Sequence, residues 1–325
     1  MNTTDRQRLF IQDVAVRDGF QIEPRFVPTE QKIALIDRLG RCGLAKIEVT
    51  SFSSPKAIPM LADAEVVMRG IARIEGVEYA ALVPNLRGCE RALACNVDEI
   101  NLVMSASESH NRANLGMSCE DSLRQFAKIL PLAHGATAIN ASLSTAFGCP
   151  FEGSVPAGRV MDLIARLTDM GIARVSLCDT TGMANPAQVE DIFGSVLRMW
   201  PTLQVTAHFH NTRGMGLANA VAALNAGVRH FDASLGGLGG CPFAPGATGN
   251  VCTEDLVHMF DSMGWNTGVD LTELLEVAAA LPIIVGHDVP GQVLKAGPWT
   301  RRHALPPTQG SPAMSPSNVC AGVRA

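Results

Sequence analysis

Residues 174–210 read RVSLCDTTGMANPAQVEDIFGSVLRMWPTLQVTAHFH, and they contain one complete strand–helix–strand repeat. The apolar, partly β-branched runs 174–177 and 203–208 are typical of strands, and the amphipathic stretch between them has the length of a helix. Asn185 and Pro186 are residue types that favour a helix start. The stretch therefore predicts two parallel strands joined by a helix.

The same alternation occurs eight times along the chain. The predicted strands are Leu9–Val16, Ala45–Thr50, Tyr79–Val83, Glu99–Val103, Ala136–Ser142, Arg174–Leu177, Leu203–His208 and His230–Ser234. The predicted helices are Thr29–Cys42, Ala62–Ile74, Leu86–Cys95, Ser118–Ala133, Pro156–Met170, Pro186–Trp200, Gly214–Ala226 and Thr253–Met263. Eight such units over about 250 residues favour an α/β fold, the (β/α)8 TIM barrel, with an open doubly wound sheet as the alternative.

The C-terminal part of the chain extends beyond the eighth unit. A further helical segment, Leu271–Leu281, is expected to cover the barrel. Residues 1–303 are therefore predicted to form a single barrel domain with C-terminal helices. Residues 304–325 are rich in proline and serine and predict a disordered tail.

Composition and charge exclude several classes of protein. The chain has 325 residues with 26 Lys or Arg and 31 Asp or Glu, so its formal net charge of −5 argues against nucleic acid as a partner. No apolar run approaches the roughly 20 residues that span a bilayer, and residues 1–10 are polar, which excludes a membrane partner. The nine cysteines are scattered without a CxxC pair, which favours a reducing compartment. We expect a cytoplasmic protein.

Polar residues that follow the predicted strands are expected to share one rim of the barrel. In a TIM barrel the catalytic side chains come from the C-terminal ends of the strands and the loops after them. Arg17, Asp18, Glu48 and Asp179 occupy such positions. Each also has a structural interpretation. Arg17 and Asp18 could form a surface salt bridge, and Glu48 and Asp179 could make hydrogen bonds at the barrel mouth.

His208 and His210 close the seventh predicted strand and are two residues apart. On an extended strand both imidazoles point to one face. With Asp18 they would offer nitrogen and carboxylate ligands to a divalent ion such as Mg²⁺, Mn²⁺ or Co²⁺. The alternative is a pair of histidines that only makes structural hydrogen bonds.

The loop Gly236–Asn250 holds six glycines in 15 residues. Such a loop can wrap closely around a ligand, and its only thiol is Cys241. A thiol on a loop of this kind is a candidate for proton transfer. A simple connection between two elements is the alternative.

Six motifs between Val14 and Val269 can be considered together. They are Arg17-Asp18-Gly19 with Gln21 and Glu23; residues 47–52 (IEVTSF) with Ser54-Pro55-Lys56; residues 148–153 (GCPFEG); Asp179-Thr180 with Gly182; His208-x-His210; and residues 237–242 (GLGGCP) ending in Gly249-Asn250. In this combination the chain resembles the 3-hydroxy-3-methylglutaryl-CoA lyase family, a branch of the metal-dependent lyases and condensing enzymes.

The resemblance implies a divalent metal, Mg²⁺ or Mn²⁺, held by Asp18, His208, His210 and Asn250. It also implies retro-Claisen cleavage of a 3-hydroxyacyl-CoA, which releases acetyl-CoA and a keto acid. Arg17 would neutralise charge on the thioester oxygen. Cys241 or a nearby water would protonate the enolate carbon, and His208 is a candidate for proton transfer as well as ligation.

Further implications concern binding and assembly. Glu48 and Asp179 would hold the catalytic groups in place. The acyl-CoA substrate would contact Arg17, Gln21, Ser105, Ser107 and Glu108, and the nearby Arg112 is a candidate phosphate contact, with a solvated surface arginine as the alternative. Family members are commonly homodimers, and leucine catabolism is the pathway that the resemblance suggests.

Three departures from the family pattern put the acyl group in question. Phe20 stands where the family commonly has leucine, Ile22 where it has asparagine, and Asn211 where it often has aspartate. Citramalyl-CoA or a longer branched 3-hydroxyglutaryl-CoA are therefore alternative substrates. A condensing synthase of the isopropylmalate or homocitrate type, and a non-enzymatic acyl-CoA or metal-binding scaffold, are the competing functions.

Overall fold

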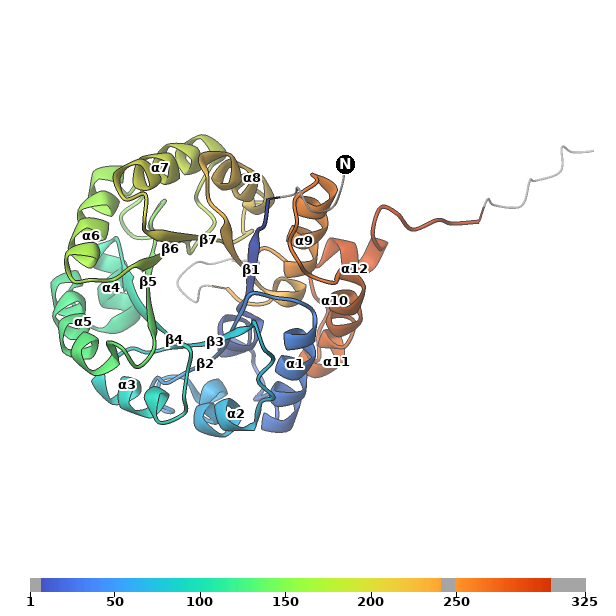
Figure 1. The fold of residues 1–325 in the computed structure, drawn as a ribbon, viewed down its shortest axis with the longest axis horizontal. Coiled ribbons are helices and arrows are strands. Elements are labelled where there is room, and N and C mark those ends of the chain that lie inside the picture. Colours follow the sequence, from blue (N-terminus) through green and yellow to red (C-terminus); the bar gives the residue numbers. More distant parts are fainter. Residues whose placement is uncertain (1–6, 241–248, 305–325) are drawn as a thin grey trace, which may run out of the picture.

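The computed structural model describes residues 7–240 and 249–304, and within them eight parallel strands close into a barrel in sequence order (Figure 1). The strands are β1 (Phe10–Asp13), β2 (Lys46–Ser51), β3 (Glu78–Leu82), β4 (Glu99–Ser105), β5 (Ala138–Ser144), β6 (Arg174–Asp179), β7 (Gln204–Phe209) and β8 (His230–Ala233). Because β8 pairs with β1, the ring has no open edge. The predicted TIM barrel is confirmed, and the open sheet is excluded.

Helices surround the barrel, and the last four lie together on the side of β1 (Figure 1). They are α1 (Thr29–Arg41), α2 (Ala64–Gly70), α3 (Leu86–Leu93), α4 (Glu108–Leu115), α5 (Cys119–Ala133), α6 (Ala157–Asp169), α7 (Pro186–Met199), α8 (Gly216–Ala226), α9 (Thr253–Ser262), α10 (Leu271–Ala278), α11 (Leu281–Val285) and α12 (Gln292–Ala296). The predicted segment Leu271–Leu281 corresponds to α10 and the start of α11. Among the described helices, none is both long and apolar enough to cross a bilayer.

The helix α7 shows how the sequence determines this arrangement. The side chain of Asn185 accepts a hydrogen bond from the Gln188 amide and caps the helix, and Pro186 occupies its first turn. The buried side chains recur at intervals of three or four residues, namely Val189, Ile192, Phe193 and Val196. This periodicity gives one apolar face that packs on the barrel.

The first strand is shorter than the sequence predicts. β1 ends at Asp13, whose carboxylate accepts a hydrogen bond from the Ala15 amide at 2.9 Å. The chain then forms a short π-helix, Ala15–Gly19, in which the amides of Arg17, Asp18 and Gly19 all converge on the Val14 carbonyl oxygen. This local hydrogen bond from the Ala15 amide to the Asp13 carboxylate thus competes with strand extension.

Polar side chains fill the barrel interior in layers from alternate strands. Near the strand starts, Lys46 and Arg174 each donate to Glu99, at 2.6 and 2.7 Å. Two residues further along the same strands lie Glu48, Asn101 and Ser176, with Asp232 on β8. This second layer forms the floor of the site described next.

Residues 305–325, which make up nearly all of the predicted tail, lie outside the described residues. The division of the chain at residue 303 therefore stays a prediction.

Candidate active site

The π-helix after β1 places Arg17 and Asp18 side by side at the barrel mouth. Arg17 donates through Nη1 to Asp18 Oδ1 at 2.6 Å and through Nε to Glu48 Oε2 at 2.5 Å. The side chain of Arg17 is 11% exposed and that of Glu48 is 5% exposed. The guanidinium is therefore held in a fixed orientation by two carboxylates, with little access of water.

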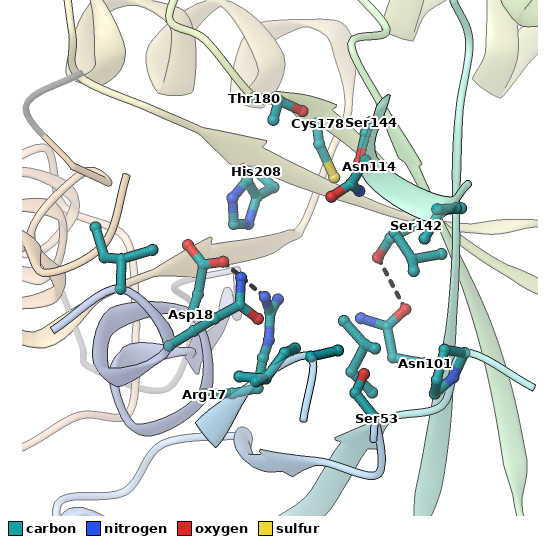
Figure 2. A pocket seen from close by; sticks show the side chains of 18 of the residues that line it. Arg17, Asp18, Ser53, Asn101, Asn114, Ser142, Ser144, Cys178, Thr180 and His208 are labelled. Atoms are coloured by element: carbon teal, nitrogen blue, oxygen red, sulfur yellow. Dashed lines mark hydrogen bonds and ion pairs between the residues drawn. The ribbon is translucent and has the colours of Figure 1, made fainter. Parts of the chain in front are cut away.

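A chain of hydrogen bonds continues from Glu48 across the barrel. Asn101 donates to Glu48 Oε1 at 2.8 Å, and its own oxygen accepts from Asn140 at 2.9 Å and from Ser142 at 2.8 Å. Figure 2 shows Ser142 and Asn101 facing the cavity opposite Arg17 and Asp18. Because the Asn101 oxygen already accepts two hydrogen bonds, its amide is fixed with the nitrogen toward Glu48.

The candidate metal ligands come from the π-helix after β1 and from the C-terminal end of β7. One ligand atom each from Asp18, His208 and His210 lies within 4.8 Å of the others. His208 Nδ1 is 3.2 Å from Asp232 Oδ2 on the neighbouring strand, which leaves the other ring nitrogen of His208 for a metal. Asn250 lies next to this group, since its amide nitrogen donates to Asp18 Oδ2 at 2.7 Å.

The electrostatics of this cluster suit a cation. Burial would raise the pKa of Asp18, but the charges of Arg17, His210 and His208 lower it to about 2, so the carboxylate stays ionised. Burial, together with the charge of His208, lowers the pKa of His210 to about 4 and keeps that imidazole neutral. Burial opposes the charge of His208, but the hydrogen bond and charge of Asp232 outweigh it and raise the pKa of His208.

Two buried atoms in the cluster have no hydrogen-bond partner within the described part of the chain, namely His210 Nδ1 and Asn250 Oδ1. Buried polar atoms are normally paired, so such atoms call for a ligand. Neutral imidazole, carboxylate and amide oxygen together form a donor set that divalent ions accept. The residues therefore fit a divalent metal.

A cavity of about 690 Å³ opens at this rim. Arg17, Asp18 and His208 line one side of it, and Asn101 and Ser142 lie on the other (Figure 2). His210 and Asp232 also line it. A substrate in this cavity would contact the arginine and the candidate metal ligands together.

Comparison with known proteins identifies the family. A family model described as HMGL-like matches residues 8–281. The chain belongs to the HMGL-like family. A hydroxymethylglutaryl-CoA lyase of Bacillus subtilis is 47% identical over 290 residues, which cover 89% of this chain and 97% of that protein. An (R)-citramalyl-CoA lyase of Chloroflexus aurantiacus is 41% identical and covers 89% of this chain and 94% of that protein.

Solved structures agree with this assignment. A structure of an HMG-CoA lyase from Acinetobacter baumannii, in complex with coenzyme A and 3-methylmalate, has 50% identity and a TM-score of 0.89. The match covers 92% of this chain and 98% of that chain. The predicted family and the predicted carbon–carbon lyase class are confirmed by these relatives.

The HMGL-like chain brings only some of the predicted site residues into the cavity. Arg17, Asp18, Gln21, His208 and His210 line it. Glu48 lies behind Arg17 and contacts it directly, as described above. Asn250 lies beside Asp18 without lining the cavity.

Asp179 acts on the backbone of its own loop. Its carboxylate accepts hydrogen bonds from the amides of Met183 and Ala184 at 2.7 and 3.1 Å. Its backbone oxygen accepts from the His210 amide at 3.2 Å. Burial raises the pKa of Asp179 to about 6, although the two amides lower it. Asp179 therefore fixes the β6 loop next to His210.

The residues predicted to bind substrate at the end of β4 and after it do not line the cavity. Ser105 is buried and hydrogen-bonded to His110 at 2.7 Å, and Ser107 caps α4 and contacts Cys149 Sγ at 2.9 Å. Glu108 pairs with Arg112 at 2.8 Å on the exposed face of α4. The predicted strand ends at Val103, two residues early, and α4 is absent from the prediction because its sequence, ESHNRANL, has little apolar periodicity.

The three residues that depart from the family pattern lie in different surroundings. Phe20 is buried in the core, whereas Ile22 is 41% exposed and lines the cavity. Asn211 accepts a hydrogen bond from the Gly216 amide at 3.0 Å and so supports the start of α8. Of the three, only Ile22 contacts the space available to a substrate. Cys241 lies outside the described residues, so its predicted role stays a prediction.

Asp232 and Asn101 are the functional residues that the sequence prediction missed. Asp232 is aligned with His208 across the β7–β8 pair. Two-residue spacing along β2, β4, β6 and β8 places Asp232 in the same layer as Glu48 and Asn101. That spacing was the signal that could have found them.

Proposed function

We propose that this HMGL-like protein is a divalent-metal-dependent lyase that cleaves a 3-hydroxyacyl-CoA similar to 3-hydroxy-3-methylglutaryl-CoA into acetyl-CoA and a keto acid. The observation that carries the proposal is the meeting of Asp18, His208 and His210 with Arg17 on one rim of the cavity. A non-enzymatic scaffold would have no need for a buried arginine pointed at a metal-binding cluster.

Asp18, His208 and His210 would hold the metal, with Asn250 Oδ1 as a fourth protein ligand. Mg²⁺ or Mn²⁺ agrees with the oxygen ligands and the open positions that a hydroxy acid could fill. The ion would lower the pKa of the substrate hydroxyl group.

The protein side chains would then direct the bond cleavage. The C3 hydroxyl group loses its proton, the C2–C3 bond breaks, and its electron pair passes to the thioester as an enolate that takes a proton at C2. Arg17, which lines the cavity, would donate to the thioester oxygen as negative charge develops there. Glu48 and Asn101 keep that guanidinium oriented, so little reorganisation is needed during the reaction.

Two proton transfers complete the reaction. His208 is the candidate for the hydroxyl proton, and Asp232 is positioned to stabilise positive charge on its ring. Cys241 is the candidate that protonates C2. Replacing Cys241 with alanine should lower kcat about 100-fold while CoA binding changes little. An equal loss of CoA binding would refute this role.

The candidates for the acyl group are hydroxymethylglutaryl, citramalyl and a longer branched 3-hydroxyglutaryl group. Hydroxymethylglutaryl-CoA agrees with the Bacillus relative, whereas citramalyl-CoA agrees with the Chloroflexus relative. Ile22 at the cavity wall favours a substrate with an apolar branch, since it adds no hydrogen-bonding group. A place in leucine catabolism and a homodimer are the parts of the proposal that come from the family alone, whereas a cytoplasmic location rests on the polar residues 1–10 and the scattered cysteines.

The test is to incubate the protein with Mg²⁺ or Mn²⁺ and a panel of 3-hydroxyacyl-CoAs that includes both compounds, and to follow acetyl-CoA by mass spectrometry. Release that a chelator abolishes supports the lyase and identifies the acyl group. Condensation of acetyl-CoA with a keto acid, without cleavage of any panel member, would instead indicate a synthase.

A further inference from the structure

One wall of the active-site cavity has no role in the reaction proposed above. Ser144, Cys178 and Thr180 form it, and they lie at the end of β5, near the end of β6 and just after β6. All three side chains are small and uncharged. Figure 2 shows them beside His208 and away from Arg17. We call this group the neutral wall.

Strand register places Cys178 next to the candidate metal ligand His208. β6 and β7 align Cys178 with His208, and β7 and β8 align His208 with Asp232. His208 therefore has two different neighbours. The carboxylate that contacts its Nδ1 comes from β8, and the thiol of Cys178 comes from β6.

The Cys178 side chain is free to serve as a packing surface. The residue is 7% exposed and lines the cavity, and its sulfur lies 3.7 Å from the Ser176 backbone oxygen on its own strand, which is a weak contact. A buried thiol of this kind behaves as a small apolar group. The Thr180 hydroxyl group is occupied, since it accepts a hydrogen bond from the Thr145 amide at 2.9 Å. The neutral wall thus offers a substrate shape rather than charge.

The groups on C3 of the proposed substrate can be assigned to directions in the cavity. The hydroxyl group and a carboxylate would fill the open positions of the metal, and the bond to C2 leads toward the thioester at Arg17. The remaining group on C3 has to point away from both. A carboxylate directed at the neutral wall would be buried without a cationic partner, which is unfavourable, whereas an alkyl group needs none.

We propose that the alkyl branch on C3 packs against the neutral wall and that Cys178 limits this branch to the size of a methyl group. The proposal rests on the proposed function, because it takes the hydroxyl group and the carboxylate to lie at the metal. Since β6 is fixed between β5 and β7, the Cys178 backbone cannot move back to admit a longer branch. Of the candidate substrates, the two with a C3 methyl group are favoured over the one with a longer branch.

The test measures kcat/KM for two substrates that differ by one methylene group, the 3-methyl acyl-CoA and its 3-ethyl homologue. The parent protein should prefer the methyl substrate at least about tenfold, since one methylene group in a pocket changes kcat/KM by about 10–200-fold. Cys178→Ala removes the sulfur atom and should shift this preference about tenfold toward the ethyl substrate. Cys178→Val has a bulkier side chain and should lower kcat/KM for both substrates.

Two control variants separate the shape of residue 178 from other effects. Cys178→Ser keeps nearly the same size, so the preference should stay within about twofold of the parent value. Val103→Ala shortens a lining side chain on β4 and should leave the preference equally unchanged. The proposal is overturned if Cys178→Ala retains the parent preference, if Val103→Ala shifts it as much, or if Cys178→Ser abolishes it. Circular dichroism of each variant checks that it is folded.

Calorimetry with free acids separates this proposal from the lyase proposal. With Mn²⁺ present, 3-hydroxy-3-methylglutarate or citramalate should bind the parent protein about tenfold more tightly than its ethyl homologue, and Cys178→Ala should reduce this difference. If this pattern is found but no acyl-CoA is cleaved, the role of the neutral wall stands and the proposed reaction fails. If cleavage occurs but neither preference depends on residue 178, the reaction stands and the role of Cys178 is refuted.

Discussion

Replacing Glu48 with glutamine tests the buried ion pair that orients Arg17. The two Glu48 oxygens accept from Arg17 Nε at 2.5 Å and from Asn101 Nδ2 at 2.8 Å. A glutamine of the same shape must point its own NH₂ group at one of these two donors. Asn101 cannot turn to accept it without losing its bonds to Asn140 and Ser142. The substitution therefore places the glutamine NH₂ group against another hydrogen-bond donor. Asp18 is then the remaining carboxylate partner of Arg17.

The expected cost follows from burial. Removing one member of a buried ion pair costs about 3–5 kcal/mol, and because Asp18 remains we expect the lower end, about 3 kcal/mol. The chain offers a matched control in Glu65→Gln. Glu65 meets Arg91 Nε at the same 2.5 Å, but the two side chains are 30% and 24% exposed. A partly exposed pair of this kind contributes about 1 kcal/mol or less, so the control should cost far less than Glu48→Gln.

Urea unfolding followed by circular dichroism measures both free energies, and steady-state kinetics measures the effect on Arg17. A displaced guanidinium should lower kcat about 100-fold, since small errors in position have effects of that size. The reasoning is refuted if Glu48→Gln and Glu65→Gln differ by less than about 0.5 kcal/mol in unfolding free energy. Unchanged kcat in Glu48→Gln would refute the orienting role of Glu48.

Three further predictions concern the metal cluster and a buried acid. His210→Ala should weaken Mn²⁺ binding at least about tenfold by calorimetry; unchanged affinity would remove it from the ligand set. Gly239→Ala should also weaken it, because Gly239 has a φ of 108° and an added Cβ would lie 2.5 Å from the Asn250 amide nitrogen; wild-type affinity would show that the loop adapts. Burial raises the pKa of Glu254 to about 7, above the unfolded value of 4.5, so the folded state binds the extra proton and its stability falls as pH rises between these values. Glu254→Gln should therefore be about 1–2 kcal/mol more stable than the parent at pH 8, with no such gain at pH 4.5 in urea unfolding; equal stability at pH 8 would contradict the assigned cost.

The barrel could be predicted from sequence because each strand–helix unit has a recognisable local pattern. The apolar strands, the capped helix starts and the spacing of α7 are all visible in residues 174–210. The rule that catalytic groups follow the strands then places Arg17, Asp18 and the two histidines on one rim, where the structure has them. These predictions needed only the periodicity of each element and the known polarity of the fold.

The sequence did not reveal contacts in which a side chain interacts over a long range or caps a short element. Ser107 follows a strand, as a substrate-binding residue would, but its hydroxyl group caps α4 and contacts Cys149. Asp232 belongs to the site because of its alignment with His208 across two strands, which requires the register of β7 and β8. A single segment of sequence does not show which of several local hydrogen bonds will form, and it does not show the register between two strands.

Because of the π-helix after β1, the number of residues in this segment matters to the site as much as their identity does. It holds one more residue per turn than an α-helix would, and the amide of Gly19 closes its wide ring on the Val14 carbonyl oxygen. Deleting one residue between Val14 and Arg17 would remove the extra residue of this turn and shift Arg17 and Asp18 relative to the histidines. Relatives and laboratory variants that retain activity should therefore differ here by substitution, and insertions or deletions should be confined to other loops of the barrel.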